Sequence, residues 1–277
     1  MIRTIPCRLG FMDANLDPAS AARALLAFWR AAGVDMDVAE AVYAAAPKAA
    51  AAAAKPAPPI TAPRPKKTVA APVDAARALA ATANTVAELR AAVEKFDGCA
   101  LKATARNTVF SDGPEDAPVL IIGDAPDKEE DEQGKPFVGQ NGAMLDRMLA
   151  PIGLTRQSNI LISHAIYWRP PGNRPPTDGE AMACLPFAER LIALTRPKLL
   201  ILTGKSSAQM LLKRTETVAK LRGRRLSYAR EGEPPVNAMV MLHPAYLVGK
   251  PQQKRLAWTD LPLAEAWLSE LGVARAL

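Results

Sequence analysis

Four short apolar runs constrain the fold of this chain more strongly than any other feature of its sequence. They lie within residues 118–122, 159–163, 198–203 and 238–242. Runs of this length, bounded by turn-forming residues, are typical of buried strands. Segments with helical patterns separate them, and strands that alternate with helices form a mostly parallel sheet covered on both faces. The sequence therefore predicts an α/β fold.

Helices are predicted between these strands and before the first one. Residues 86–96 place apolar side chains on one side of a helix, and Thr85 with Glu88 forms a capping-box pattern at its start. A long loop, residues 123–141, follows the first strand. The remaining predicted helices lie at 142–151, 178–195, 205–213 and from about residue 251.

The chain divides by composition into three parts. Residues 1–45 have short helical patterns, whereas residues 46–73 are rich in Ala, Pro and Lys, with five basic residues and no acidic one. That composition predicts an extended, partly disordered linker, and residues 74–277 form the predicted α/β domain. The linker is interpreted either as a solubilising spacer or as a tether that binds phosphates irrespective of sequence.

The balance of charge points to a polyanionic partner. The net charge is +7 and the pI is about 9.4, which favours nucleic acid over acidic partners. The sequence has no apolar run long enough to span a membrane, and its first residues lack the apolar core of a signal peptide. Three widely spaced cysteines give no disulfide framework and fit a reducing compartment. We expect a cytoplasmic monomer.

The two histidines of the chain each follow a predicted strand. His164 follows the second strand and His243 follows the fourth, while the first strand runs into Gly-Asp-Ala-Pro-Asp at residues 123–127. Ligands of open α/β sheets bind outside the carboxyl ends of the strands. The three strand ends therefore predict one composite pocket.

Four ordered motifs carry a resemblance to a known family. They are Gly-Asp-Ala-Pro-Asp at 123–127, Gly-Lys-Pro-Phe-Val-Gly at 134–139, Arg-Pro-Pro-Gly-Asn-Arg at 169–174 and His-Pro-Ala-Tyr-Leu at 243–247. Together they resemble the motifs of family 4 uracil-DNA glycosylases over roughly residues 96–265. The resemblance implies a three-layer α/β/α sandwich with a central four-stranded, mostly parallel sheet. It also implies hydrolysis of the N-glycosidic bond of uracil in DNA, a step of base excision repair.

The resemblance also implies roles for residues in the pocket. His243 would donate a hydrogen bond to uracil O2 as the base leaves as an anion, provided that its other ring nitrogen is fixed by a backbone partner. Phe137 would stack on the flipped base, and the backbone around Asp124 and Ala125, stiffened by Pro126, would complete the cradle. The alternatives are a structural His243 and a Phe137 that only anchors its loop in the core.

Carboxylates near the first motif are candidates for assisting the attack of water. Asp124 ranks first because it occupies the motif position itself, and Asp127, Glu130 and Asp131 follow it in the sequence. Acidic runs are also common on solvated loops, so the alternative is that most of these carboxylates only face water.

Three positions depart from the family pattern. Asp124 stands where the family usually has Glu, Asp127 where it has Gly, and His164 where it has an Asn that reads uracil. One imidazole can accept from N3–H or donate to O4, but cannot do both in one plane. His164 is therefore interpreted as a specificity switch, as a chemical participant or as part of a degraded pocket. A non-catalytic module that binds DNA lesions remains the alternative function.

The cysteines depart from the family as well. Its members typically hold a [4Fe–4S] cluster with four cysteines, but here Cys99 and Cys184 fill two of these positions while Phe96 and Trp168 fill the others. Two thiolates cannot hold such a cluster. The sequence therefore predicts that the cluster is lost, that no other cofactor is bound, and that apolar packing fills its place.

Contacts to DNA are predicted from basic residues near the motifs. Arg169, Arg174, Lys250 and Lys254 are candidates for phosphate contacts, and Leu247 is the candidate wedge that fills the gap left by a flipped base. A further basic run lies at residues 220–225. The alternative is an ordinary basic surface.

Overall fold

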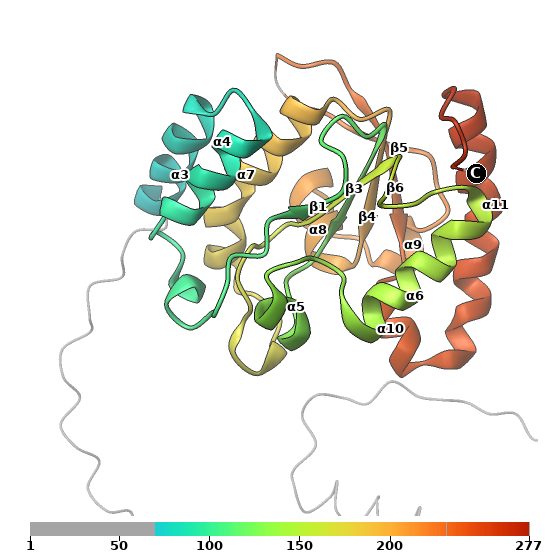
Figure 1. The fold of residues 1–277 in the computed structure, drawn as a ribbon, viewed down its shortest axis with the longest axis horizontal. Helices are drawn as coiled ribbons and strands as arrows, with labels where there is room; N and C mark the ends of the chain where they lie inside the picture. The colour runs from blue at the N-terminus through green and yellow to red at the C-terminus, as the bar shows by residue number, and fades with distance from the viewer. Residues whose placement is uncertain (1–69, 231, 277) are drawn as a thin grey trace, which may run out of the picture. The chain divides into compact units, whose positions relative to one another are not determined.

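A six-stranded sheet forms the centre of the fold in a computed structural model, which describes residues 70–230 and 232–276 (Figure 1). The strand order is β1-β3-β2-β4-β6-β5, with β3, β2, β4 and β6 parallel and β1 and β5 antiparallel at the two edges. The strands are β1 (Ser111–Asp112), β2 (Val119–Gly123), β3 (Ile160–His164), β4 (Leu199–Thr203), β5 (Leu226–Tyr228) and β6 (Val236–Met241).

The four central strands confirm the predicted parallel sheet. The edge strands β1 and β5 were not predicted, because two and three residues are too few to give a recognisable alternation of apolar and polar positions. An edge strand pairs with one neighbouring strand only, so its sequence gives little indication that it forms a strand.

Helices cover the sheet on two sides, so the fold is the predicted α/β/α sandwich (Figure 1). Helices α3, α4, α7 and α8 contribute to one core cluster, and α6, α10 and α11 to the other. None of the helices in the described ranges is long and apolar enough to cross a membrane. The α-helices are α3 (Ala70–Thr82), α4 (Val86–Lys95), α5 (Lys128–Gln133), α6 (Gly139–Leu149), α7 (Asp178–Thr195), α8 (Lys205–Leu212), α9 (Val218–Leu221), α10 (Pro244–Gly249) and α11 (Lys254–Glu270). Short 3-10 helices occur at Ala100–Ala103, Ala150–Ile152, Pro171–Asn173 and Pro251–Gln253.

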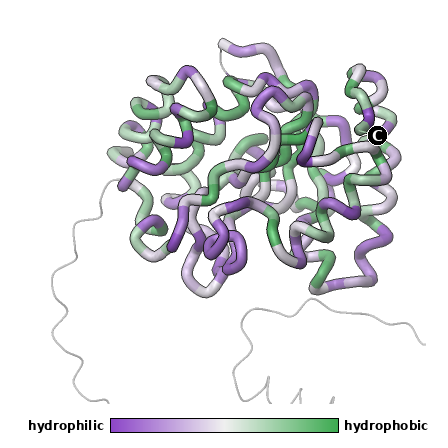
Figure 2. The backbone as a smooth tube through the Cα atoms, viewed as in Figure 1, coloured by the Kyte–Doolittle hydropathy of each residue, from purple (hydrophilic) through white to green (hydrophobic). Residues whose placement is uncertain are grey.

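Strand β2 shows how the sequence builds this core. All five of its residues are buried, with Leu120 and Ile122 in the cluster on one face and Val119 and Ile121 in the cluster on the other. Each buried aliphatic side chain contributes about 1.5–3 kcal/mol of transfer free energy. The apolar central strands, green in Figure 2, therefore fix the sheet and leave its polar strand ends at one edge.

Three predicted boundaries differ from the structure. Helix α3 begins at Ala70, inside the predicted linker 46–73, because its alanines form a helix that packs on α7. The predicted loop 123–141 contains α5, and α6 begins at Gly139 rather than at residue 142. Two glycines in the first turn of α6 weaken its sequence signal. The predictions for residues 1–45 and for 46–69 lie outside the described residues.

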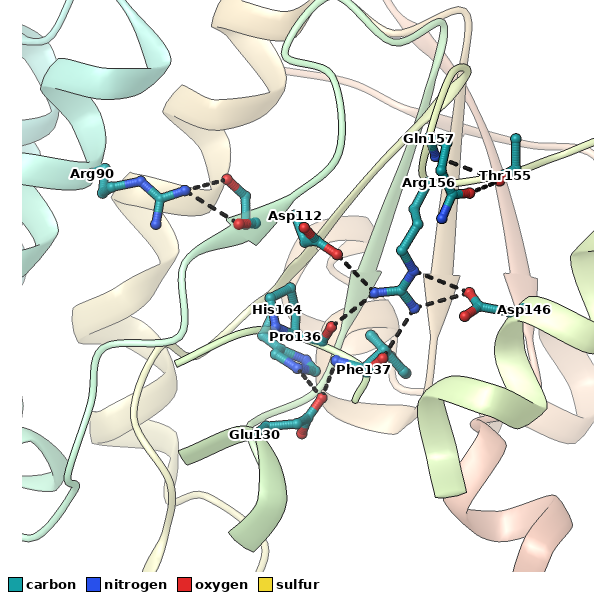
Figure 3. A network of polar contacts seen from close by, with 11 residues as sticks. Arg90, Asp112, Glu130, Pro136, Phe137, Asp146, Thr155, Arg156, Gln157 and His164 are labelled. Atoms are coloured by element: carbon teal, nitrogen blue, oxygen red, sulfur yellow. Dashed lines mark hydrogen bonds and ion pairs between the residues drawn. The ribbon is translucent and has the colours of Figure 1, made fainter. Parts of the chain in front are cut away.

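Arg156 ties the loop that carries Phe137 to the sheet (Figure 3). Its guanidinium donates to Asp112 and Asp146, both at 2.9 Å, and to the carbonyl oxygens of Pro136 at 3.3 Å and Phe137 at 3.0 Å. Burial lowers the pKa of Arg156, but the two carboxylates outweigh burial and raise it. One side chain thus joins β1, α6 and the Phe137 loop.

We predict that Arg156→Ala lowers the free energy of unfolding by about 1–3 kcal/mol, because two carboxylates and two carbonyl oxygens lose their donor. Urea denaturation measures this change. Arg147→Ala, which removes an exposed arginine of α6, is the control and should change stability by less than about 0.5 kcal/mol. Equal effects of the two substitutions would contradict this role of Arg156.

Candidate functional site

A cavity of about 390 Å³ lies at the polar edge of the sheet, where the loops after β2, β4 and β6 meet. A larger cavity, about 540 Å³, lies between α7 and β5 and contains none of the predicted site residues. The predicted residues that line the cavity at the sheet edge are Asp124, Ala125, Pro126, Asp127, Glu130, Phe137, Arg174 and His243. The structure therefore brings most of the predicted site together.

His243 is held as a neutral donor. It caps the N-terminus of α10, where its Nδ1 accepts a hydrogen bond from the N–H of Ala245 at 3.2 Å. Because Nδ1 accepts, the proton of the neutral ring lies on Nε2. Burial is the largest influence on His243 and lowers its pKa. Nε2 is buried and has no partner among the described residues, and His243 belongs to the cavity wall.

Glu130 organises the loop between β2 and α6. Its carboxylate accepts from the N–H of Phe137 and from His164 Nε2 at 2.9 Å (Figure 3). It also accepts from the backbone N–H of Asp127 at 2.7 Å. Burial raises the pKa of Glu130, but these donors outweigh burial and lower it. A carboxylate engaged by three donors is poorly placed to activate water, so its geometry differs from the predicted catalytic role and fits a positioning role.

His164 lies behind Phe137 and does not line the cavity. It is 1 % exposed, pairs with Glu130 and stacks on the Phe137 ring, with centroids 4.9 Å apart and planes 25° apart. A Cβ at Gly123 would lie 2.5 Å from His164 Nδ1, so this packing requires glycine there. In this arrangement His164 supports Phe137, its Nδ1 is buried without a partner among the described residues, and its contact with a base stays a prediction.

Phe137 is both buried and part of the cavity wall. Its ring lies 5.5 Å from that of His243, and its side chain is 1 % exposed. Its φ of 49° is unusual for a residue with a Cβ, and bonds from its N–H to Glu130 and from Arg156 to its carbonyl oxygen hold it there. The core-anchor interpretation is thus supported, and stacking on a base stays a prediction.

Asp124 faces the start of α8. Its carboxylate accepts from the N–H of Lys205 at 3.0 Å, and from the N–H and hydroxyl of Ser207 at 2.8 and 3.0 Å. A Cβ at Gly204 would lie 2.4 Å from this carboxylate, so the approach of the two loops depends on glycine. Asp124 thereby fixes the loop after β2 against the loop after β4, on the wall of the cavity.

The other two acidic candidates have different surroundings. Asp127 caps α5 by accepting from the N–H of Glu130 at 3.0 Å, and its second oxygen accepts from Asn141 at 2.8 Å. Asp131 is buried away from the cavity and accepts from the N–H groups of residues 106 and 107. Of these two residues, only Asp127 lines the cavity.

Comparison with known proteins places the chain in a family. The profile of the Uracil DNA glycosylase superfamily matches residues 110–265, more than half of the chain. The chain belongs to this superfamily. It is 34 % identical to a type-4 uracil-DNA glycosylase of Archaeoglobus fulgidus over 158 residues, which are 56 % of this chain and 78 % of the relative. It is 32 % identical over 180 residues to that of Pyrobaculum aerophilum, covering 64 % and 91 %, and 28 % identical over 183 residues to that of Thermotoga maritima, covering 65 % and 93 %.

The residues predicted to contact DNA are only partly placed at the site of this glycosylase fold. Arg174 lines the cavity and forms a two-pronged ion pair with Glu180, at 2.9 and 2.6 Å. Arg169 lies outside the cavity lining and donates to Asn173 at 2.7 Å. Lys254 lies beside a smaller cavity between α6 and α11. Of the predicted basic residues, Arg174 is therefore the one in the cavity wall.

The predicted wedge is buried. Leu247 is 0 % exposed and belongs to the core, so its side chain is not available to DNA in this conformation. The adjacent Tyr246 is 40 % exposed, and the ammonium group of Lys250 lies 5.0 Å from its ring centroid. In the basic run, Arg222 and Arg225 form ion pairs with carboxylates of α11, so they also serve the fold.

The residues at the cluster positions do not fit an iron–sulfur cluster. Cys99 and Cys184 are buried and share a hydrogen bond, which together with burial raises the pKa of Cys184. The ring of Phe96 packs 6.4 Å from that of Trp168 and 5.1 Å from that of Phe187. Nowhere in the described ranges do three or more His, Cys, Asp or Glu side chains gather as a metal site.

Beside the predicted Glu130, the polar cavity residues outside every predicted motif are Asn141, Lys205 and Ser206. Lys205 and Ser206 follow β4, which lies between β2 and β6, so the rule that ligands bind at strand ends could have found them. Asn141 had no such signal, because it lies in the first turn of a helix whose start was predicted too late.

We predict that Glu130→Gln destabilises the protein by about 1–3 kcal/mol at pH 7, because an amide cannot accept from all three donors. Because the pKa of Glu130 is lowered in the folded protein, the free energy of unfolding that Glu130 contributes decreases at low pH. The stability it contributes is present above the unfolded pKa of about 4.3 and is lost as the pH falls through the lower folded pKa.

Urea denaturation of wild type and variant between pH 7 and pH 3 measures this difference, which should shrink with falling pH. Glu129→Gln, an exposed neighbour on the same helix, is the control and should have little effect. A difference that stays constant down to pH 3 would show that Glu130 does not act through its charge.

Proposed function

We propose that this chain is a uracil-DNA glycosylase that hydrolyses the N-glycosidic bond between uracil and deoxyribose in DNA. The observation that carries the proposal is the neutral His243, a residue of the cavity wall whose buried Nε2 has no hydrogen-bond partner among the described residues. Membership of the superfamily and similarity to type-4 enzymes support it. The cavity volume, about 390 Å³, falls within the range of small-molecule sites.

His243 acts on the charge that develops as the bond breaks. A base in duplex DNA must first leave the stack to reach a pocket. As the glycosidic bond lengthens, negative charge moves onto uracil O2, and the Nε2–H of His243 donates to that oxygen. This hydrogen bond is stronger in the transition state than in the ground state, so it lowers the barrier. Because Ala245 already holds the ring, little reorganisation is needed.

The sugar carbon becomes positively charged in the same step, and a water attacks it. Asp124 and Asp127 both line the cavity. Their oxygens accept from protein donors, so we assign them electrostatic stabilisation of the sugar cation and orientation of water. As the new carbon–oxygen bond forms, the water loses one proton, which neutralises the departing uracil anion. Phe137, braced by His164, would bound the pocket on the face of the base.

We also propose that the protein works without an iron–sulfur cluster. Phe96 and Trp168 occupy two positions where family members have cysteines, and the ring of Phe96 packs with those of Trp168 and Phe187. Aromatic packing of this kind supplies stability by burial of apolar surface. The cluster is then unnecessary for holding the segment around Cys99 against α7.

We predict that His243→Ala lowers the single-turnover rate of uracil release by about 100–1000-fold, the usual effect of removing one oxyanion donor. Affinity for uracil-containing DNA should change little, because the donor acts mainly in the transition state. Lys198→Ala, at the opposite end of the sheet, is the control and should retain full activity.

The assay uses single- and double-stranded oligonucleotides that contain one uracil, with hypoxanthine, xanthine and undamaged strands beside them. Free uracil from the wild type supports the proposed reaction. An unchanged rate for His243→Ala would remove this residue from the mechanism. If the wild type binds uracil-containing DNA in a salt-sensitive way but releases no uracil, the chain is a non-catalytic module that binds DNA lesions.

We predict that the purified protein is colourless and contains no stoichiometric iron, as measured by visible absorption and elemental analysis. The double substitution Cys99→Ser with Cys184→Ser should leave uracil release within about twofold of wild type, because neither thiol lines the cavity. A brown protein with four irons per chain would contradict the loss of the cluster.

A further inference from the structure

Asn141 borders the same cavity as His243. It lies in the first turn of α6, is half-buried and comes from a different element than any residue predicted to bind the base. Its Nδ2 donates to the carboxylate of Asp127 at 2.8 Å. A side-chain amide is thus held at the wall of the proposed uracil pocket.

The partner of Asn141 fixes the direction of its amide. The carboxylate of Asp127 only accepts hydrogen bonds, so the nitrogen of the amide, and not its oxygen, must face Asp127. The Oδ1 atom and the second N–H then have no hydrogen-bond partner within the described part of the chain. Asn141 therefore offers one acceptor and one donor side by side.

Uracil has the complementary pattern on its base-pairing edge. Its N3–H is a donor, and O4 beside it is an acceptor, whereas cytosine has an acceptor at N3 and a donor at position 4. We propose that Asn141 reads the flipped base, its Oδ1 accepting from N3–H and its Nδ2 donating to O4, while His243 binds O2. This inference rests on the proposed function and names the residue that gives it base specificity.

Other polar residues near the cavity are less suited to this task. His164 does not line the cavity: its ring stacks on Phe137, its Nε2 pairs with Glu130, and its unpartnered Nδ1 is buried against Gly123. Asn173 does line it, but its Oδ1 already accepts from Arg169 at 2.7 Å, so it has no comparable free acceptor. Asn141 is therefore the side-chain amide in the cavity wall whose oxygen and second N–H both lack a partner among the described residues.

Two motif residues that depart from the family pattern, Asp127 and His164, are both related to the position of Asn141. Asp127 stands where the family pattern has glycine, and its carboxylate is the group that orients Asn141. His164 stands where that pattern has asparagine, and it has turned to Glu130 and Phe137. The amide that reads uracil has thus moved from the end of β3 to the start of α6, together with the acid that holds it.

The test compares uracil with N3-methyluracil in otherwise identical single-stranded oligonucleotides. Methylation removes the N3–H donor, so wild type should release the methylated base at least about tenfold more slowly. Asn141→Ala should release uracil about ten- to a hundredfold more slowly than wild type and lose most of its preference for uracil over the methylated base.

Two further variants separate recognition from structure. Gln140→Ala removes a neighbouring exposed amide outside the cavity and should keep both the rate and the preference of wild type. Asp127→Asn retains Asn141 but lets its amide turn over, so the preference should fall although Asn141 is present. The ratio of kcat/KM for the two substrates is the readout, because general destabilisation slows both alike.

The outcomes distinguish this inference from the proposed function. If wild type releases no uracil, the proposed function fails. If wild type releases uracil and Asn141→Ala keeps its full preference over N3-methyluracil, the function stands and Asn141 is not the reader. A loss of preference in both Asn141→Ala and Asp127→Asn, with Gln140→Ala unchanged, supports the inference.

Discussion

The buried carboxylate of Glu130 is the interaction on which the site depends. Through three hydrogen bonds it fixes Asp127 at the start of α5, Phe137 in a backbone conformation unusual for its residue type, and His164 at the end of β3. A buried charge of this kind is tolerated only when donors surround it, so the loop, the helix and the strand end are specified together. The wall of the cavity follows from that one arrangement.

The two histidines divide their roles because their surroundings differ. His164 has its Nε2 engaged by a carboxylate and its face covered by Phe137, so it serves the architecture. His243 has its Nδ1 engaged by a backbone N–H, which leaves the proton on Nε2, an atom without a partner among the described residues. The same type of side chain therefore supports Phe137 at one strand end, and at the other we propose that it donates to the leaving base.

The sequence predicted the parts of the fold that rest on local patterns. The four apolar runs became the central strands, helix 178–195 has the predicted bounds, and Thr85 accepts from the N–H of Glu88 as expected. The side-chain directions at the site could not be predicted, because they depend on partners distant in sequence. Asp124 reaches Ser207, and Leu247, predicted to be exposed, fills the core.

The state of His243 is the central claim, and NMR of the histidine ring nitrogens tests it most directly. The chain contains two histidines, so the spectrum has two imidazoles, and His243→Ala assigns them. The ordinary pKa of histidine is about 6.5, and burial lowers the pKa of His243 below it. At pH 6.5 the ring should therefore be neutral, with its proton on Nε2. A ring that is protonated at pH 6.5, or neutral with its proton on Nδ1, would contradict the account.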